Sequence, residues 1–412
     1  MLRQSSRYWR LAGLAALLAG LLGPAGAALA AEPIKIGVTI AMSPPGSVSQ
    51  GTQVRDGTDV AVKMINDAGG VLGRPIELVY EDTQGLPEKA RAAVEKLITS
   101  DHVVALTGEH QSSNVLAEIE VAHRYHIPYI NVNGWADAIR EKGYVEVFNP
   151  NNYNTRVAVA MAAAMKALGA KRVIAFCENT DYGVGLAKGL GEQLKAAAPE
   201  IDYKYETLDR AGKDFLPALL PLRANPPDAV VEIMLPPAAY IVLNQLYEQG
   251  IAPSAKTWLY DASGIADYPD FWQNVGDGAK DMIVFGLYHP KMAMPELGKK
   301  VAAAYTAKTK NEPSRLLFQA ADGFFVLAEA IKAAGSTDPD AMIKALEGIK
   351  WTGTRGEISF SSEKSGYRYH QWIDIPYVTF QITGVKQPMA DTNLVQEAGK
   401  PLDVGKLQKP AM

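Results

Sequence analysis

The chain has 412 residues, a formal net charge of −4, 48% hydrophobic residues and a single cysteine, Cys177. This length is enough for two domains with separate cores. The negative charge makes nucleic acid and anionic lipid poor partners, and one cysteine excludes an intramolecular disulfide.

The first thirty residues have the pattern of a secretory signal peptide. Arg3, Arg7 and Arg10 precede twelve residues that are only Leu, Ala and Gly, and small residues follow as far as Ala30. The apolar stretch is shorter than the roughly 20 residues that a membrane span needs. We therefore predict a signal peptide over residues 1–30 and a mature chain free outside the cytoplasm.

Short apolar runs alternate with amphipathic stretches from Ile34 onward, which is typical of β-α units around a parallel sheet. The rhythm restarts at Thr155, so two successive α/β sheets fit better than one very wide sheet. Strand segments are predicted at 34–40, 69–82, 103–108, 127–133, 172–179, 201–208, 229–235, 256–263 and 281–289, and helices at 87–100, 112–125, 155–168 and 182–197.

The last third of the chain has too few strands for another sheet. Predicted helices at 296–309, 316–334 and 339–349 precede two short strand-like runs. We assign residues 31–152 and 290–354 to lobe 1, residues 153–289 and 355–390 to lobe 2, and residues 391–412, which lack periodicity, to a C-terminal surface tail.

Glycines at 183, 185 and 189 follow an apolar strand and approach the dinucleotide-binding fingerprint. Their spacing is G-x-G-x-x-x-G, one residue too long for it. We interpret them as a closely packed strand-to-helix turn, with Asp181 as the helix N-cap and Tyr182 directed at the strand ends, where α/β sheets bind ligands. No cofactor is expected.

Other enzyme motifs are missing from the sequence. It has no G-x-S-x-G elbow, no P-loop and no H-E-x-x-H. His123 and His126 form an H-x-x-H pair at a predicted helix end without an acid at ligand spacing, so a solvated helix end is favoured over a metal site. We expect no enzyme activity and no metal.

Polar residues follow several predicted strands at their carboxyl ends. Residues 109–113 place His110, Ser112 and Ser113 at a helix N-terminus, where backbone N–H groups bind anions. Ser112 suits either an N-cap or an anion site. Gly134 and Trp135 follow the next strand and Asp261 a later one, and their convergence at two facing sheet edges favours a ligand site.

The motifs "INDAGGVLGRPIEL" and "TDYGVGLA" together resemble the leucine/isoleucine/valine-binding type of periplasmic binding protein, which delivers solutes to ABC importers. The resemblance implies an α/β fold of two doubly wound parallel-sheet lobes joined by three crossovers, with a ligand cleft between them. It places the crossovers near residues 151–153, 288–290 and 352–356. It also implies a periplasmic monomer whose partners are a small-molecule solute and the membrane permease subunits.

The resemblance further implies roles for individual residues. Ser112 corresponds to the hydroxyl that meets a ligand carboxylate, Tyr182 to a cleft tyrosine, and Gln50 to a position where an aromatic wall is common. The implied ligand-binding set is His110, Ser112, Ser113, Gly134, Trp135, Tyr182, Asp261, Gln50 and Tyr153.

The ligand class stays open at this point. Amino-acid binders of this type place a carboxylate after the strand equivalent to 256–263, but Ala262 stands there with Asp261 one residue away, and Leu235 replaces an expected polar or aromatic group. The primary expectation is a branched-chain or hydrophobic amino acid or a similar small carboxylate, and the alternatives are an amine-free aromatic or aliphatic carboxylate and an amide. A ligand-sensing subunit of a signalling system and a secreted enzyme are further alternatives.

Overall fold

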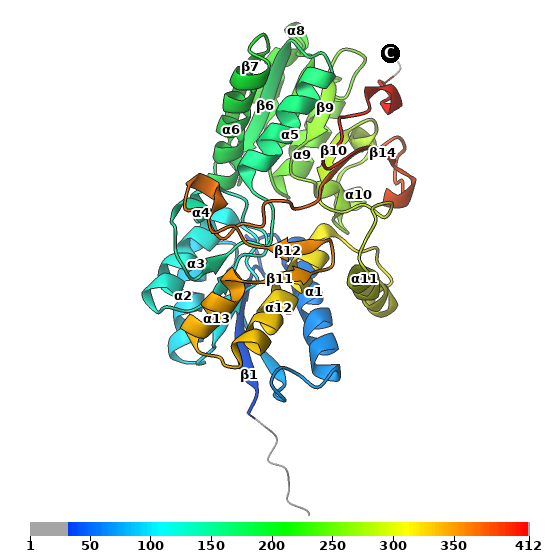
Figure 1. The fold of residues 1–412 in the computed structure, drawn as a ribbon. Helices are drawn as coiled ribbons and strands as arrows, with labels where there is room; N and C mark the ends of the chain where they lie inside the picture. The colour runs from blue at the N-terminus through cyan, green and yellow to red at the C-terminus, as the bar shows by residue number, and fades with distance from the viewer. Residues whose placement is uncertain (1–31, 411–412) are drawn as a thin grey trace, which may run out of the picture.

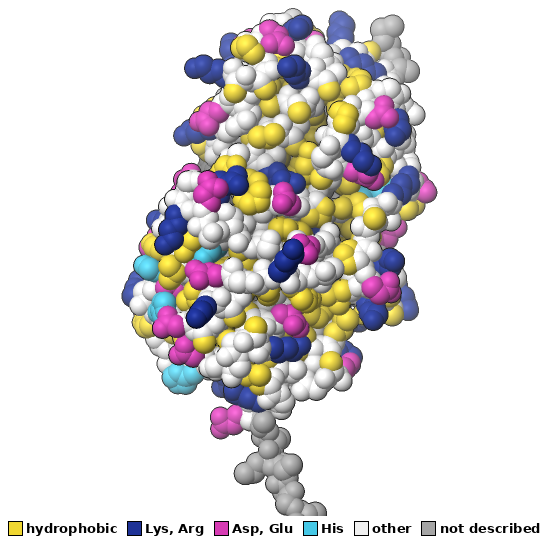
Figure 2. All heavy atoms as spheres, in the orientation of Figure 1, with side chains coloured by type: hydrophobic (Ala, Val, Ile, Leu, Met, Phe, Trp, Pro, Cys, Tyr) yellow, Lys and Arg dark blue, Asp and Glu magenta, His cyan; other side chains and the backbone are white. Residues whose placement is uncertain are grey.

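The computed structural model describes residues 32–410, which form two stacked α/β lobes (Figure 1). The predicted signal peptide lies outside the described residues. Within residues 32–410, no helix is long and apolar enough to cross a membrane. On the face drawn in Figure 2, acidic and basic side chains are interspersed over both lobes.

Lobe 1 contains a five-stranded parallel sheet in the order β2-β1-β3-β4-β5. Its strands are β1 (Ile34–Ile40), β2 (Ile76–Asp82), β3 (Ala105–Thr107), β4 (Tyr129–Ile130) and β5 (Val147–Phe148). Its helices are α1 (Val48–Asp67), α2 (Pro87–Thr99), α3 (Ser112–Arg124), α4 (Ala138–Glu141), α11 (Glu296–Thr309), α12 (Arg315–Ala334) and α13 (Pro339–Glu347).

Both faces of this sheet are covered, as continuous apolar strands require. Alternate residues of β3 and β4 join different cores: Leu106 and Tyr129 pack with α2 and α3, whereas Ala105 and Ile130 share a core with α1 and α12. Helices α1 and α12 approach closely at Gly57, where a Cβ would lie 2.3 Å from the Leu317 carbonyl oxygen.

Lobe 2 contains a seven-stranded sheet in the order β14-β13-β10-β9-β8-β6-β7, in which β6 to β10 are parallel. Its strands are β6 (Arg172–Glu178), β7 (Asp202–Leu208), β8 (Ala229–Ile233), β9 (Trp258–Asp261), β10 (Ile283–Gly286), β13 (Val378–Gln381) and β14 (Asn393–Glu397). Its α-helices are α5 (Asn154–Ala167), α6 (Asp181–Ala197), α7 (Leu216–Leu219), α8 (Pro221–Ala224), α9 (Ala238–Glu248) and α10 (Phe271–Asn274). Short 3-10 turns are η1 (Ile265–Asp267), η2 (Asp277–Ala279), η3 (Gly366–Arg368), η4 (Met389–Asp391) and η5 (Val404–Lys406).

The C-terminal segment corrects the predicted surface tail over residues 391–412. Strand β14 pairs antiparallel with β13 and forms the edge of the second sheet. Val395 and Leu402 are buried in the core of lobe 2. The segment is ordered because it pairs the free backbone edge of β13 and covers apolar surface, which a periodicity search over a five-residue strand does not detect.

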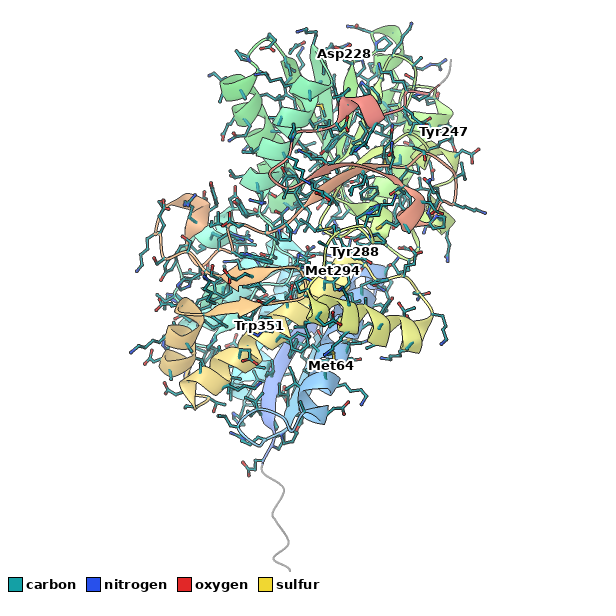
Figure 3. The ribbon with its side chains drawn as sticks, turned by 45° about the vertical axis from the view of Figure 1, so that its right-hand side comes forward. Met64, Asp228, Tyr247, Tyr288, Met294 and Trp351 are labelled. Atoms are coloured by element: carbon teal, nitrogen blue, oxygen red, sulfur yellow. The ribbon has the colours of Figure 1, made fainter. Side chains whose placement is uncertain are left out.

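The chain passes between the lobes three times. The first two passages lie between residues 148 and 154 and between residues 286 and 296, and Figure 3 shows Tyr288 and Met294 at the junction. The third passage was expected at residues 352–356, and this expectation is wrong. There the chain forms the hairpin of β11 (Lys350–Thr352) and β12 (Glu357–Ser359) instead.

Contacts to α12 hold this hairpin in lobe 1. The Thr354 backbone N–H donates to Asp322, and the buried Arg355 guanidinium forms an ion pair with Asp322 at 3.1 Å. A β-bridge between Asn149 and Gln371 keeps the following segment beside lobe 1. The chain therefore enters sheet 2 only between residues 372 and 378.

Candidate ligand site

A pocket lies between the lobes at the carboxyl ends of their strands. Its position is the one where open α/β sheets bind ligands. Lobe 1 contributes His110, Gln111, Ser112, Ser113, Asn133, Trp135 and Arg315, and lobe 2 contributes Glu178, Thr180, Tyr182, Arg210, Leu235 and Ser263.

The lobe 1 wall is built around the N-terminus of α3. Gln111 is the N-cap, and Ser112 is the first helical residue, so Ser112 is not the N-cap. The Ser112 hydroxyl oxygen accepts a hydrogen bond from the Ala136 backbone N–H at 3.1 Å, which leaves the hydroxyl proton free to be donated. This hydroxyl and the helix N-terminus together make the wall suitable for an anion.

The loop after β4 supplies an aromatic side chain to the same wall. Trp135 is buried, donates from Nε1 to Asn133 at 2.8 Å, and meets Tyr182 edge-on with ring centroids 5.8 Å apart. Gly134 does not line the pocket. Its carbonyl accepts hydrogen bonds from the side chains of Arg140, Asn131 and Asn151, so it holds the loop in place.

The lobe 2 wall begins at the turn between β6 and α6. The Tyr182 hydroxyl lies 2.9 Å from the Ser263 hydroxyl, and burial raises the pKa of Tyr182 well above its ordinary value, so it stays protonated. The N-cap of α6 is Thr180, whose hydroxyl accepts from the Gly183 N–H, and not Asp181 as predicted. A Cβ on Gly183 would lie 2.4 Å from the Glu178 carbonyl oxygen, which confirms the tightly packed turn.

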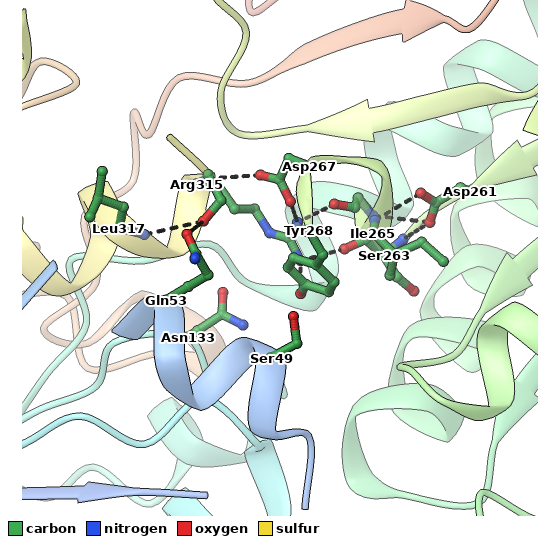
Figure 4. A network of polar contacts seen from close by, with 12 residues as sticks. Ser49, Gln53, Asn133, Asp261, Ser263, Ile265, Asp267, Tyr268, Arg315 and Leu317 are labelled. Carbon is green, nitrogen blue, oxygen red and sulfur yellow. Dashed lines mark hydrogen bonds and ion pairs between the residues drawn. The ribbon is translucent and has the colours of Figure 1, made fainter. Parts of the chain in front are cut away.

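Asp261 lies outside the pocket. Its carboxylate accepts hydrogen bonds from the backbone N–H groups of Ser263, Gly264 and Ile265 at 2.7, 3.0 and 3.0 Å (Figure 4). The carboxylate is fully buried and satisfied by its own loop. Ser263, two residues further on, lines the pocket in its place.

Gln50 and Tyr153 also lie outside the pocket. Gln50 is buried on α1, and its amide has no hydrogen-bond partner among the described residues. Tyr153 is buried ahead of α5 and stacks on Tyr367 at 4.8 Å.

Arg315, which the sequence reasoning missed, connects the two lobes. Its guanidinium is buried at the start of α12 and forms an ion pair with Asp267 at 2.6 Å. It also donates to the Ser263 and Gly264 carbonyls and to the Tyr268 hydroxyl of lobe 2, as Figure 4 shows for this group of residues. A positive charge in the first turn of a helix is unfavourable, because it opposes the helix dipole. An arginine at the predicted start of a helix therefore indicates a paired or functional residue, and this signal was available for Arg315.

Glu178 and Arg210 are the other charged residues that were missed. Glu178 ends β6, is buried, and accepts from the Leu235 N–H at 2.8 Å and from the Thr180 hydroxyl at 2.6 Å. It is the one carboxylate among the described lining residues. Arg210 donates across the cleft to the Gln111 side chain at 3.1 Å. An acid at the carboxyl end of an apolar strand was a usable signal for Glu178.

His123 and His126 lie away from the pocket and share one carboxylate. Their Nδ1 atoms are 2.9 and 2.6 Å from the two oxygens of Glu146, and His126 Nε2 is 2.8 Å from Asp340. Across residues 32–410, no group of three or more His, Cys, Asp or Glu side chains is placed to hold a metal ion. The pair therefore belongs to a surface network of hydrogen bonds.

Comparison with known proteins gives one family and a consistent set of structures. A family model described as "Periplasmic binding protein" matches residues 33–372. An "Amino acid binding protein" of Pseudomonas aeruginosa is 28% identical over 313 residues, which cover 74% of this chain and 79% of that protein.

Two solved structures share the fold. A leucine binding protein from Thermotoga maritima superposes with a TM-score of 0.78 at 24% identity, covering 88% of this chain and 98% of the other. A solute binding protein of an ABC transporter from Rhodopseudomonas palustris, in complex with 3,4-dihydroxybenzoic acid, gives 0.77 at 20% identity, covering 92% and 99%.

Proposed function

Since this chain belongs to the periplasmic binding protein family, we propose that it captures a small organic carboxylate between its lobes and delivers it to the permease subunits of an ABC importer. The observation that carries the proposal is the α3 N-terminus at the pocket between the lobes, with the Ser112 hydroxyl proton free and the Gln111 Nε2 and Arg315 Nε donors unpartnered within residues 32–410. Buried donors are nearly always hydrogen-bonded, and a carboxylate supplies the missing acceptors.

The position of Asp261 favours an acid without an α-amine. A buried ammonium without an opposite charge costs several kcal/mol, and the Asp261 carboxylate is engaged by three backbone N–H groups of its own loop. The aromatic rings of Trp135 and Tyr182 then enclose an apolar solute body. The bound 3,4-dihydroxybenzoic acid of the Rhodopseudomonas structure is an acid of this class.

An α-amino acid is the second candidate, and Glu178 is the observation that favours it. Each Glu178 oxygen accepts one hydrogen bond within the described residues, and a carboxylate oxygen has capacity for a second. The Pseudomonas relative is named an amino acid binding protein. In this case Glu178, and not Asp261, holds the ammonium.

The proposal includes the compartment in which the protein acts and its partner. Cleavage of the predicted signal peptide releases a monomer into the periplasm, where closure of the lobes around the solute precedes docking on the permease. No catalytic role is assigned to any residue of the pocket, and no cofactor is needed. The genes that neighbour this one distinguish an importer subunit from a signalling receptor with the same fold, because an importer requires permease and ATPase genes.

A thermal-shift screen tests the proposal. The mature protein is unfolded and refolded to remove any co-purified solute, then heated with benzoate, 4-methylpentanoate, the twenty amino acids and benzamide. A ligand at 100 times its dissociation constant adds about 2.7 kcal/mol to the free energy of unfolding. Stabilisation by acids supports the proposal, and stabilisation by benzamide alone contradicts it.

Calorimetry of Glu178→Gln then separates the two candidates. If the solute is an α-amino acid, this variant loses its binding because the ammonium has no counter-charge. If the solute lacks an amine, the variant binds it at least as tightly as the natural protein does. The amide introduced by this substitution keeps an oxygen for the Leu235 N–H, which limits damage to the fold.

A further inference from the structure

The imidazole of His110 lies in the pocket wall with both ring nitrogens unused. The residue is 1% exposed and lines the pocket, and neither Nδ1 nor Nε2 has a hydrogen-bond partner in residues 32–410. Native structures leave few buried polar atoms unpaired, and each such atom requires an explanation. On the wall of a ligand pocket, the explanation is a group of the solute that pairs with the ring.

Burial lowers the pKa of His110 below its ordinary value and so favours the neutral ring; nearby Glu109 opposes this shift, whereas the positive charges of Arg210 and Arg315 add to it. A neutral imidazole has one nitrogen that donates and one that accepts. His110 therefore offers the solute one acceptor atom, and the tautomer decides which nitrogen it is.

Glu109 sets the tautomer. Its Oε1 accepts from the backbone N–H groups of His110 and Gln111 at 2.8 and 2.9 Å, which fixes the carboxylate beside the ring. His110 Nδ1 lies 3.5 Å from this oxygen. A proton on Nδ1 is attracted by the carboxylate and a lone pair there is repelled, so Nδ1 carries the proton and Nε2 is the acceptor.

The acceptor atom Nε2 of His110 requires a hydrogen-bond donor on the solute. The other unpartnered atoms of the wall, Gln111 Nε2 and Arg315 Nε, are donors that suit the carboxylate. The proposed function favours a solute without an ammonium, because the Asp261 carboxylate is engaged by its own loop. A hydroxyl group donates a hydrogen bond without bringing a positive charge.

We infer that the solute is a carboxylic acid that also carries a hydroxyl group, and that His110 selects it by accepting a hydrogen bond from this hydroxyl at Nε2. The inference rests on the proposed function, because it takes the carboxylate position at α3 as given. His110 is thereby a specificity-determining residue, and Ser112 is the anchor that all acids of the class share.

Titration calorimetry with two matched series tests this inference. One series is benzoate, 3-hydroxybenzoate and 4-hydroxybenzoate; the other is 4-methylpentanoate, 2-hydroxy-4-methylpentanoate and leucine. In at least one series, a hydroxylated acid is expected to bind about tenfold or more tightly than its parent acid, because the parent leaves Nε2 unpaired. Leucine is expected to bind more weakly than its hydroxy counterpart.

Two variants assign the preference to the ring. His110→Phe keeps the ring shape without the nitrogens and is expected to bring the parent and hydroxylated acids within about twofold of each other. His110→Gln retains an acceptor oxygen and is expected to recover part of the preference. Thermal unfolding of both ligand-free variants checks that they are folded.

The outcomes separate this inference from the function on which it rests. Equal affinity for parent and hydroxylated acids in both series, an unchanged preference in His110→Phe, or tighter binding of leucine than of its hydroxy counterpart overturns the inference and leaves the carboxylate-binding function standing. If no acid of either series binds, the proposed function is contradicted as well.

Discussion

The Ser112 hydroxyl lines the pocket at the N-terminus of α3, and its proton is free to be donated to a ligand. We predict that Ser112→Ala weakens binding of a carboxylate ligand by roughly 1.5 to 3 kcal/mol, the usual contribution of a hydrogen bond to a charged group. Ser113→Ala is the comparison variant: its hydroxyl lines the pocket but donates to Asp181 of lobe 2, so its loss measures the effect of a cross-cleft contact alone. Titration calorimetry showing equal losses in both variants would reduce Ser112 to a loop contact with Ala136.

Asp261 is expected to act on folding and not on ligand choice. Asp261→Asn weakens the hydrogen bonds from three backbone N–H groups, and we predict that it lowers the free energy of unfolding by about 1 to 3 kcal/mol. The affinity for the solute should change less than threefold once the variant is folded. Urea unfolding and calorimetry measure the two effects separately. Loss of binding without loss of stability would return Asp261 to the site.

Among the individual residues of the pocket, those that follow strands were predicted from the sequence. His110, Ser112, Ser113, Trp135 and Tyr182 were predicted because strand ends of a parallel sheet meet at one edge, and all five line the pocket. Arg315 could not be found by this rule. It begins a helix far along the chain, and its place at the pocket depends on how α12 packs against α1.

Arg315 also governs the contact between two elements, the start of α12 and the loop 263–268. We predict that Arg315→Met destabilises the protein by about 3 to 5 kcal/mol, because it leaves the buried Asp267 carboxylate without its partner. The double variant Asp267→Asn with Arg315→Met should recover part of this loss, which thermal unfolding measures. Equal destabilisation in the single and double variants would show that the ion pair is not the cause.

His126 links the end of α3 to α13 and is expected to make stability depend on pH. Hydrogen bonds to Asp340 and Glu146 raise the pKa of His126 in the folded protein. Its stabilising effect is therefore fully present below the ordinary histidine pKa and is lost as the pH rises through the raised value. The side chain is 44% exposed, so the effect should stay under about 1 kcal/mol.

The variant His126→Asn tests this pH dependence. Asn tolerates the positive φ of 55° at this position, so backbone strain does not confuse the result. Urea unfolding at pH 6 and pH 9 should show a stability difference from the natural protein at the lower pH that shrinks at the higher one. A difference that is the same at both values would contradict the proposed proton linkage.

Among the secondary-structure elements, helices and long strands were predicted well from the sequence, whereas the short strands near the C-terminus were not. The predicted helix over 296–309 has the observed bounds of α11, because its polar and apolar residues repeat at helical spacing. Strands β11, β12 and β14 are three to five residues long. Strands this short leave little local pattern, which is why the tail and the third crossover were misplaced.

At the scale of the whole molecule, the structure shows the lobes in contact across the cleft. Ser113 donates to Asp181 at 2.6 Å, Ser49 donates to Asp270 at 2.7 Å, and Arg210 donates to Gln111 at 3.1 Å. Together with the Arg315 contacts, these bonds join surfaces that must separate to admit a solute. We therefore predict a form with the lobes apart that admits the solute, with the three crossover segments as the hinge.

Small-angle scattering on the refolded, ligand-free protein, with and without a saturating acid from the screen, tests whether a solute is enclosed between the two lobes. We predict a smaller radius of gyration in the bound state, because the cross-cleft contacts form when the lobes meet around the solute. An identical radius in both states, at a ligand concentration that calorimetry shows to be saturating, would contradict capture by lobe closure.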